Sequence, residues 1–241
     1  MFPQLGTNEL RNNFFRRQLL CEFLGTFFLM LVRKTVSTVE ATRWAVTKVA
    51  FAQGLTLAAL TKLFSRISGA HINPAVSLSF FVVGEMGTLR FIFYIMMQFL
   101  GAVFAVIAYR SYAFANANAD AEVKSLESWQ KILLEVILTI MFIMLIRAMA
   151  DNQYRTQRSS MSMAIGLAYT ACLLSGSGIS EVALNPFLHF SSDGNIFDAD
   201  WMPAIGSTLG GVFGAWIYEL LYMPHKSDIQ RSSSIFDWLR K

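Results

Sequence analysis

The sequence has little charge and few cysteines and histidines, and each shortage excludes a class of protein. Charged residues make up 15% of the 241 residues, well below the ~25% of soluble domains. Two cysteines, Cys21 and Cys172, both in apolar stretches, cannot form a disulfide framework. Three histidines and a net charge of +4 give neither a clustered metal site nor a nucleic-acid-binding surface. With no nucleophile–base pair and no phosphate-binding glycine loop, we expect no enzyme and no cofactor.

Apolar residues dominate what remains. They form 54% of the chain, 21 of them are phenylalanine, and the mean hydropathy is +0.45. This composition predicts an all-α integral membrane protein in the lipid bilayer. Arginines precede the first apolar run, which lacks a small-residue cleavage site, so we expect a first transmembrane helix rather than a cleaved signal peptide. Six spans are predicted, at residues 17–36, 44–64, 90–112, 129–149, 161–174 and 202–223.

Six spans place both termini on one side of the membrane. Thirteen of the twenty lysines and arginines fall on that side, which predicts that both termini are cytoplasmic. We divide the chain into a tail at 1–13, a membrane domain at 14–223 with halves 14–112 and 129–223, and a tail at 224–241. The plasma membrane and an intracellular membrane are both open.

Between the second and third spans lies a short segment that opens with Asn73-Pro74. Asparagine is a good N-cap and proline a good first helical residue. The apolar run that follows ends at Gly84, too short for the ~20 residues that cross a bilayer. It predicts either a re-entrant half-helix lining a cavity or an ordinary cytoplasmic loop with a capped helix.

The spacing of polar residues repeats in the two halves. Glu22 lies 51 residues before Asn73, and Glu135 lies 50 residues before Asn185. Gly54 and Gly166 each lie 19 residues before their asparagine. Three spans per half is an odd number, so the second half is inverted, and its site is expected at the midplane between the halves.

The stretch Ser68-Gly-Ala-His-Ile-Asn-Pro-Ala-Val76, together with the two span glutamates and Gln98, resembles the aquaporin (major intrinsic protein) family. The resemblance implies six transmembrane helices, two re-entrant half-helices that meet at the midplane, and a homotetramer with one pore per subunit. It implies that the two asparagines donate hydrogen bonds to passing solutes and that Glu22 and Glu135 have the structural role of holding the re-entrant loops. The implied pore motifs are Asn73, Pro74, Ala75, Asn185, Pro186 and Phe187.

The second motif departs from the family pattern. Phe187 stands where the family has alanine, and Leu188 where it has the arginine of the outer constriction. The remaining constriction positions are then Gln53, Leu173 and Val182, so the constriction carries no permanent charge and no ring. These departures resemble the unorthodox, super-aquaporin branch, although the intact first motif is not usual there.

Several basic residues lie near the motifs, and two of them, His71 and Arg33, have two interpretations each. By the resemblance His71 lines the cytoplasmic vestibule, and we favour a hydrogen-bonded wall residue over a pH gate. Arg33, followed by Lys34 late in the first span, is expected to snorkel to the outer headgroups. The alternative is that Arg33 partly replaces the missing pore arginine. For His189, packing is expected.

The predicted function is a passive channel for water or small uncharged solutes such as glycerol, urea or peroxide. The alternative is a non-conducting protein of the same fold with a structural or adhesion role, because the Phe187 ring could plug the midplane. A secondary transporter also uses inverted repeats, but six spans and the intact first motif argue against it.

Overall fold

The computed structural model describes residues 12–37, 43–113, 127–151, 160–176, 180, 182–189 and 201–222, and these contain helices and no strand. Six long helices and two short ones follow one another along the chain. They are α1 (Asn13–Ser37), α2 (Arg43–Phe64), α3 (Pro74–Val82), α4 (Thr88–Ala113), α5 (Ser128–Ala150), α6 (Met161–Gly176), the 3₁₀ helix η3 (Pro186–His189) and α7 (Trp201–Tyr222).

The six long helices coincide with the six predicted spans to within a few residues. By length and composition, the apolar parts of three of them, Thr88–Ser111, Ser128–Ala150 and Trp201–Tyr222, could each cross a membrane. The helix Met161–Gly176 is apolar but shorter. Residues 1–11 of the first predicted tail and all of the second lie outside the described residues, and α1 already begins at Asn13.

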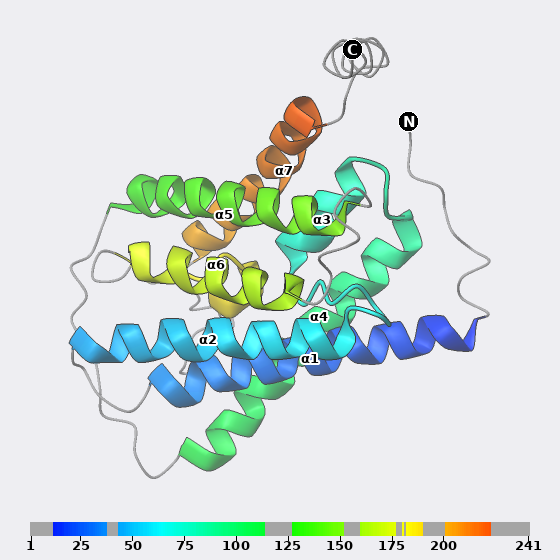
Figure 1. The fold of residues 1–241 in the computed structure, drawn as a ribbon. Helices are drawn as coiled ribbons and strands as arrows, with labels where there is room; N and C mark the ends of the chain where they lie inside the picture. The colour runs from blue at the N-terminus through cyan, green and yellow to red at the C-terminus, as the bar shows by residue number, and fades with distance from the viewer. Residues whose placement is uncertain are drawn as a thin grey trace.

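The helices pack in pairs that follow the inverted repeat. In the first half α1 packs on α4, in the second α5 packs on α7, and α2 and α6 join the halves. Figure 1 shows α1, α2, α5 and α6 running side by side, with α4 and α7 crossing them obliquely. We call the end of the bundle where α1 begins the inner end, and the end where α1 finishes the outer end.

Two glycines make the contact between the halves possible. A Cβ atom on Gly54 of α2 would lie 1.8 Å from Oγ1 of Thr170 and 2.5 Å from the carbonyl oxygen of Gly166. A Cβ atom on Gly166 of α6 would lie 2.4 Å from the carbonyl oxygen of Gly54. Small residues at such a crossing let two backbones approach closely, which is how helices associate where lipid removes the hydrophobic driving force.

The helix α3 has well-formed ends. Oδ1 of Asn73 accepts a hydrogen bond from the backbone N–H of Ala75 at 2.8 Å, and Pro74 is the first helical residue. At the other end Gly84 has a φ of 80°, and the N–H groups of Gly84 and Glu85 donate to the carbonyls of Phe81 and Phe80. This pair of hydrogen bonds around a glycine in the left-handed conformation is a Schellman motif. The predicted stop at Gly84 therefore has a clear physical cause.

The second short helix is described only at its start. We predicted a half-helix opened by Asn185-Pro186, but the described helix there is the single 3₁₀ turn Pro186–His189. The residues that would extend it, 190–200, lie outside the described residues.

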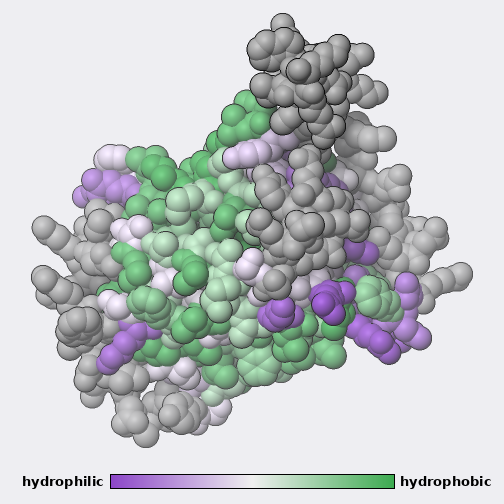
Figure 2. Space-filling view, in the orientation of Figure 1, coloured by the Kyte–Doolittle hydropathy of each residue, from purple (hydrophilic) through white to green (hydrophobic). Residues whose placement is uncertain are grey.

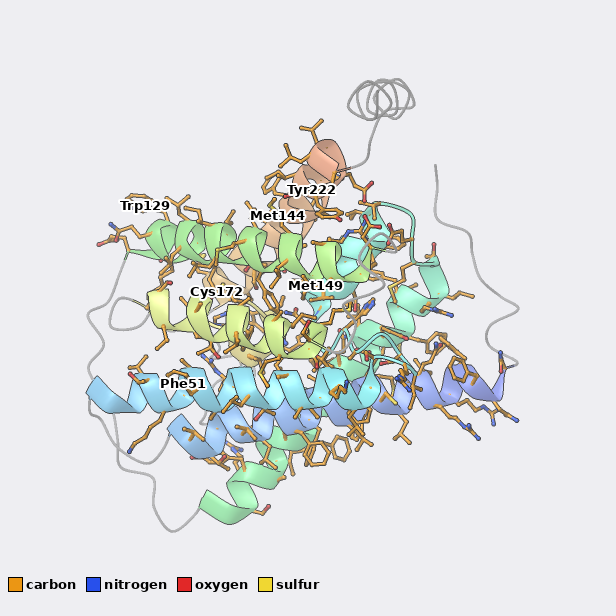
Figure 3. The ribbon with its side chains drawn as sticks, in the orientation of Figure 1. Phe51, Trp129, Met144, Met149, Cys172 and Tyr222 are labelled. Carbon is orange, nitrogen blue, oxygen red and sulfur yellow. The ribbon has the colours of Figure 1, made fainter. Side chains whose placement is uncertain are left out.

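The outer surface of the bundle is apolar. Large hydrophobic side chains such as Phe51, Leu167 and Trp216 are about half exposed, whereas Cys172 is fully buried; Figure 3 labels Phe51 and Cys172 on their helices. Figure 2 shows a hydrophobic belt between two ends where hydrophilic residues gather. An exposed apolar surface of this extent marks contact with lipid or another protein.

We predict that Gly54→Leu separates α2 from α6. Over-packing of a tight contact costs typically about 1–3 kcal/mol, and here the nearest atoms include backbone. The thermal midpoint in detergent should fall clearly below that of Ala59→Leu, a control on the exposed side of the same helix. Equal midpoints for the two variants would contradict the close packing.

Candidate functional site

Two asparagines from opposite halves meet at the centre of the bundle. Nδ2 of Asn73 donates to the carbonyl oxygen of Leu184 at 2.8 Å. Nδ2 of Asn185 donates to the carbonyl oxygen of Ile72 at 3.1 Å. Each asparagine therefore holds the loop that carries the other, and both bonds link residues more than one hundred positions apart.

The two accepting carbonyls belong to strained residues. Ile72 and Leu184 each have a φ of 54°, in the left-handed region. That conformation is a genuine outlier for a β-branched residue such as isoleucine, and such strain costs of order 1–3 kcal/mol. It occurs at the same place in both halves, directly before the asparagine. The strain therefore belongs to the arrangement that brings the two loops together.

Each asparagine retains a donor for a further partner. A side-chain amide carries two N–H groups and one carbonyl oxygen. The oxygens of Asn73 and Asn185 cap their own helices, accepting from Ala75 and Phe187 at 2.8 Å and 3.0 Å. One N–H of each amide bonds the opposite loop, so the second N–H is available to a molecule beside it. Both asparagines line the cavity described below.

Glu22 holds the first loop from α1. Its carboxylate accepts from the backbone N–H groups of His71 and Ile72 at 3.0 and 2.7 Å, from Oγ of Ser68 at 2.6 Å and from Nε2 of Gln98 at 2.8 Å. The side chain is fully buried. A buried carboxylate needs such partners, because burying a charge without hydrogen bonds is costly.

Glu135 makes the matching contacts in the second half. It accepts from the backbone N–H groups of Ala183 and Leu184 at 2.8 and 3.1 Å. Nε2 of His189 lies 3.2 Å from the same carboxylate. His189 thus contacts the carboxylate of Glu135, whereas from the sequence we expected only packing.

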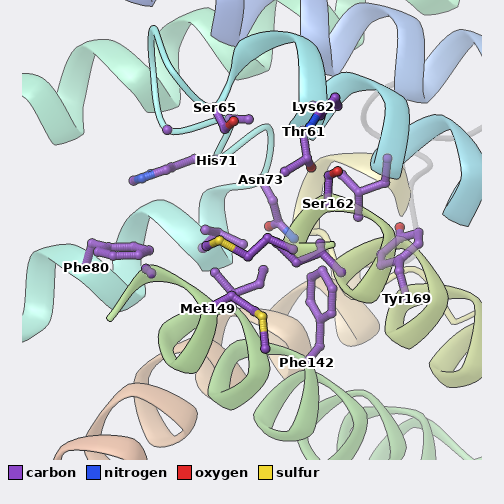
Figure 4. Close-up of a pocket in the computed structure, with 18 of the residues that line it drawn as sticks. Thr61, Lys62, Ser65, His71, Asn73, Phe80, Phe142, Met149, Ser162 and Tyr169 are labelled. Carbon is purple, nitrogen blue, oxygen red and sulfur yellow. The ribbon is translucent and has the colours of Figure 1, made fainter. Parts of the chain in front are cut away.

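A cavity of about 940 Å³ opens toward the inner end and reaches the asparagine pair. Its apolar wall includes Leu29, Leu57 and Phe142, and its polar wall includes Thr61 and His71. Figure 4 shows Asn73 at its centre, with His71 and Phe80 to one side and Phe142 and Tyr169 to the other. A cavity with a largely apolar wall and a few placed polar groups is typical of small-molecule sites.

His71 is fixed in the wall of this cavity. Its Nδ1 atom is hydrogen-bonded to Oγ of Ser77 at 3.1 Å, and its ring stacks on Phe80 with centroids 4.8 Å apart. Tyr94 packs against it edge-on at 5.4 Å. This geometry agrees with the hydrogen-bonded wall residue that we favoured.

The four residues expected at the outer constriction do not line this cavity. Gln53, Leu173, Val182 and Leu188 are buried, and Nε2 of Gln53 donates to the carbonyl of Leu29. The repeat nevertheless gives each of them a counterpart that does line the inner cavity. These counterparts are Ile165 for Gln53, Thr61 for Leu173, Ala70 for Val182 and Val76 for Leu188. By the symmetry of the repeat, the four lie on the outer side of the asparagine pair, where all four are buried.

Phe187 lies to the side of the asparagine pair. Its ring packs edge-on against Phe99 of α4, with centroids 5.6 Å apart, and it is not among the described residues that line the cavity. Its counterpart Ala75 packs against Gly211 of α7. The Phe187 ring thus points toward α4, and its role as a plug of the midplane stays a hypothesis for the flux measurements below.

Sequence reasoning missed two residues that position the loops. The hydroxyl of Tyr169 donates to the carbonyl of Ala183 at 2.7 Å. Arg147, which we had counted only as a basic residue of the inner side, is 4% exposed and pairs with Glu85 and Glu219. Its guanidinium also lies 4.8 Å from the centre of the Phe80 ring. Both residues could have been noticed in the sequence, because each is a polar side chain inside or at the end of an apolar span. Such side chains usually have a polar partner.

Comparisons with known proteins agree with this architecture. A model of the major intrinsic protein family matches residues 9–218. Lens fiber major intrinsic protein of Mus musculus is 30% identical over 243 residues, covering 96% of this chain and 91% of that protein. The Homo sapiens protein of the same name is 31% identical over 239 residues, covering 94% and 89%. A crystal structure of the aquaglyceroporin from Plasmodium falciparum, 21% identical, superposes with a TM-score of 0.75 over 86% of this chain and 96% of that one, a likeness of fold.

We predict that Glu22→Gln and Glu135→Gln both destabilise the protein. Each keeps the shape of the side chain, loses charge-assisted hydrogen bonds worth about 1.5–3 kcal/mol each and sets an amide N–H₂ among donors. Thermal melting in detergent should show a lower midpoint for both than for Glu127→Gln, an exposed control. If all three melt alike, the carboxylates do not hold the loops.

Proposed function

The chain belongs to the major intrinsic protein family, and on that premise we propose that it is a passive pore for water and small uncharged solutes, glycerol among them. Members of this family are channels, and the chain is a membrane channel rather than an enzyme. The conduction path that we propose runs from the inner cavity past the asparagine pair and through the outer layer of Gln53, Leu173, Val182 and Leu188.

The observation that carries the proposal is the reciprocal pair Asn73–Leu184 and Asn185–Ile72 at the end of the cavity. It leaves one N–H donor per asparagine toward the path, flanked by the apolar Leu29 and Phe142. Such a wall suits a solute with both hydroxyl and hydrocarbon surface. At the same place the N-terminus of α3 carries about half a positive charge, which opposes the entry of cations.

The non-conducting alternative was based on Phe187 as a plug of the midplane. The packing of this ring against Phe99 supports an open path rather than a plug. The homotetramer and the cytoplasmic placement of both termini remain predictions from the resemblance and from the distribution of lysine and arginine. The choice of membrane and the individual solutes are open to the flux experiments below.

We predict that Asn73→Ala and Asn73→Ser both lower water and glycerol permeability per molecule. Both remove the amide donor, but serine is still a good N-cap, so Asn73→Ser separates the pore role from the capping role. Stopped-flow swelling and shrinkage of proteoliposomes measures both fluxes, with protein content as the reference. Parental permeability in both variants, in folded protein, would contradict the role of Asn73 as a pore donor.

A second prediction compares the two departures of the second motif. Phe187→Ala should leave both fluxes near the parental values while lowering stability, because its ring packs against α4. Leu188→Arg should lower glycerol flux more than water flux, since it adds bulk and charge to the closely packed outer half. Both are measured in the same vesicles. A large rise in flux for Phe187→Ala would show that its ring does obstruct the path.

A further inference from the structure

Arg33 is a buried cation at the outer end of α1. The side chain was expected to snorkel to the headgroups, yet the residue is only 7% exposed. Its Nη1 atom donates to the carbonyl oxygen of Val182 at 3.3 Å. A charged side chain inside a membrane protein is expensive and marks a solute pathway more often than not. Val182 itself belongs to the outer layer that we assign to the conduction path.

The inverted repeat shows which way this face of α1 points. Leu29 of α1 and Phe142 of α5 each follow their span glutamate by seven residues, and both line the cavity beside the asparagine pair. One helical turn further along, side chains share the same face. On α5 that next residue is Ile146, which lines the inner cavity. On α1 it is Arg33, which the same symmetry places in the outer half of the path.

We group five described residues as the outer layer, and Arg33 is the charged one among these five. The other four members are Gln53, Leu173, Val182 and Leu188. All five are buried, and all five have counterparts lining the inner cavity, which are Ile165, Thr61, Ala70, Val76 and, for Arg33, Ile146. Leu188 contributes neither donors nor charge to this layer.

We propose that Arg33 is a specificity-determining residue of the pore. Its guanidinium reaches the outer constriction from α1, whereas the second motif contributes only Leu188 there. This inference rests on the proposed function. A fixed positive charge in a narrow, closely packed path raises the barrier to cations. The rigid, planar group also narrows the opening for a solute as wide as glycerol more than for water.

The first experiment removes the charge and compares fluxes. Arg33→Leu, Arg33→Lys and the parent are reconstituted beside Arg110→Leu, which removes an exposed cation at the outer end of α4. The melting of each variant in detergent is measured first, and Arg33→Lys, which keeps the charge, provides a second variant for the comparison in folded protein. Arg33→Leu should raise glycerol flux severalfold more than water flux and admit potassium ions. Arg33→Lys should keep ions out while changing the glycerol-to-water ratio, and Arg110→Leu should match the parent.

The second experiment tests the position of residue 33 without using conduction. In a background with Cys21→Ser and Cys172→Ser, the pair Arg33→Cys with Val182→Cys should be joined within one chain by a short bifunctional thiol reagent. The pair Arg110→Cys with Val182→Cys should not be joined, because Arg110 faces outward.

The two experiments separate the failure of this inference from the failure of the proposed function. If the parent conducts and Arg33→Leu behaves like Arg110→Leu, the role of Arg33 is overturned and the pore stands. If neither the parent nor any variant conducts, the pore fails, and with it the role that rests on it. A cross-linked pair then supports the buried placement of Arg33 alone, and an unlinked pair overturns that too. If the parent shows no flux and Arg33→Leu does, Arg33 is the group that blocks the path, which supports its placement in the constriction.

Discussion

The whole arrangement depends on one constraint, that irregular backbone at membrane depth must find hydrogen-bond partners within the protein. In the first loop the N–H groups of His71 and Ile72 donate to Glu22, and in the second those of Ala183 and Leu184 donate to Glu135. The carbonyls are satisfied as strictly, since Leu184 accepts from Asn73 and Ile72 from Asn185. The residues that make a pore possible are therefore those that satisfy its backbone.

The same repeat gives the proposed path two unequal halves. Toward the inner end its positions hold residues such as Thr61, Ala70 and Val76, and a cavity of about 940 Å³ remains between them. Toward the outer end larger residues, including Leu173 and Leu188, fill the equivalent positions and pack closely. Equivalent backbones with different side-chain volumes thus account for a wide inner half and a narrow outer half.

Much of this fold could be predicted from the sequence, because its signals are long apolar runs and unusual polar residues between them. The helix boundaries and the stop at Gly84 follow from these signals, and so does the relation of Glu22 to Glu135. The directions of individual side chains could not be predicted. In a membrane protein both the lipid-facing and the buried sides of a helix are apolar, so periodicity does not say which face meets the path. That is why Arg33 was expected at the headgroups and Phe187 at the midplane.

The reciprocal asparagine bonds also set an order in which the protein can be completed. Asn73 needs a carbonyl 111 residues further along the chain, and Asn185 needs one 113 residues back. A ribosome that has delivered only the first three spans has delivered a loop whose glutamate can already hold it but whose asparagine has no partner. The centre of the molecule is thus a late product of synthesis. Contacts of such long range are slow to form, since the intervening chain must first be ordered. Each loop therefore acquires its last hydrogen-bond partner only when the other half is in place.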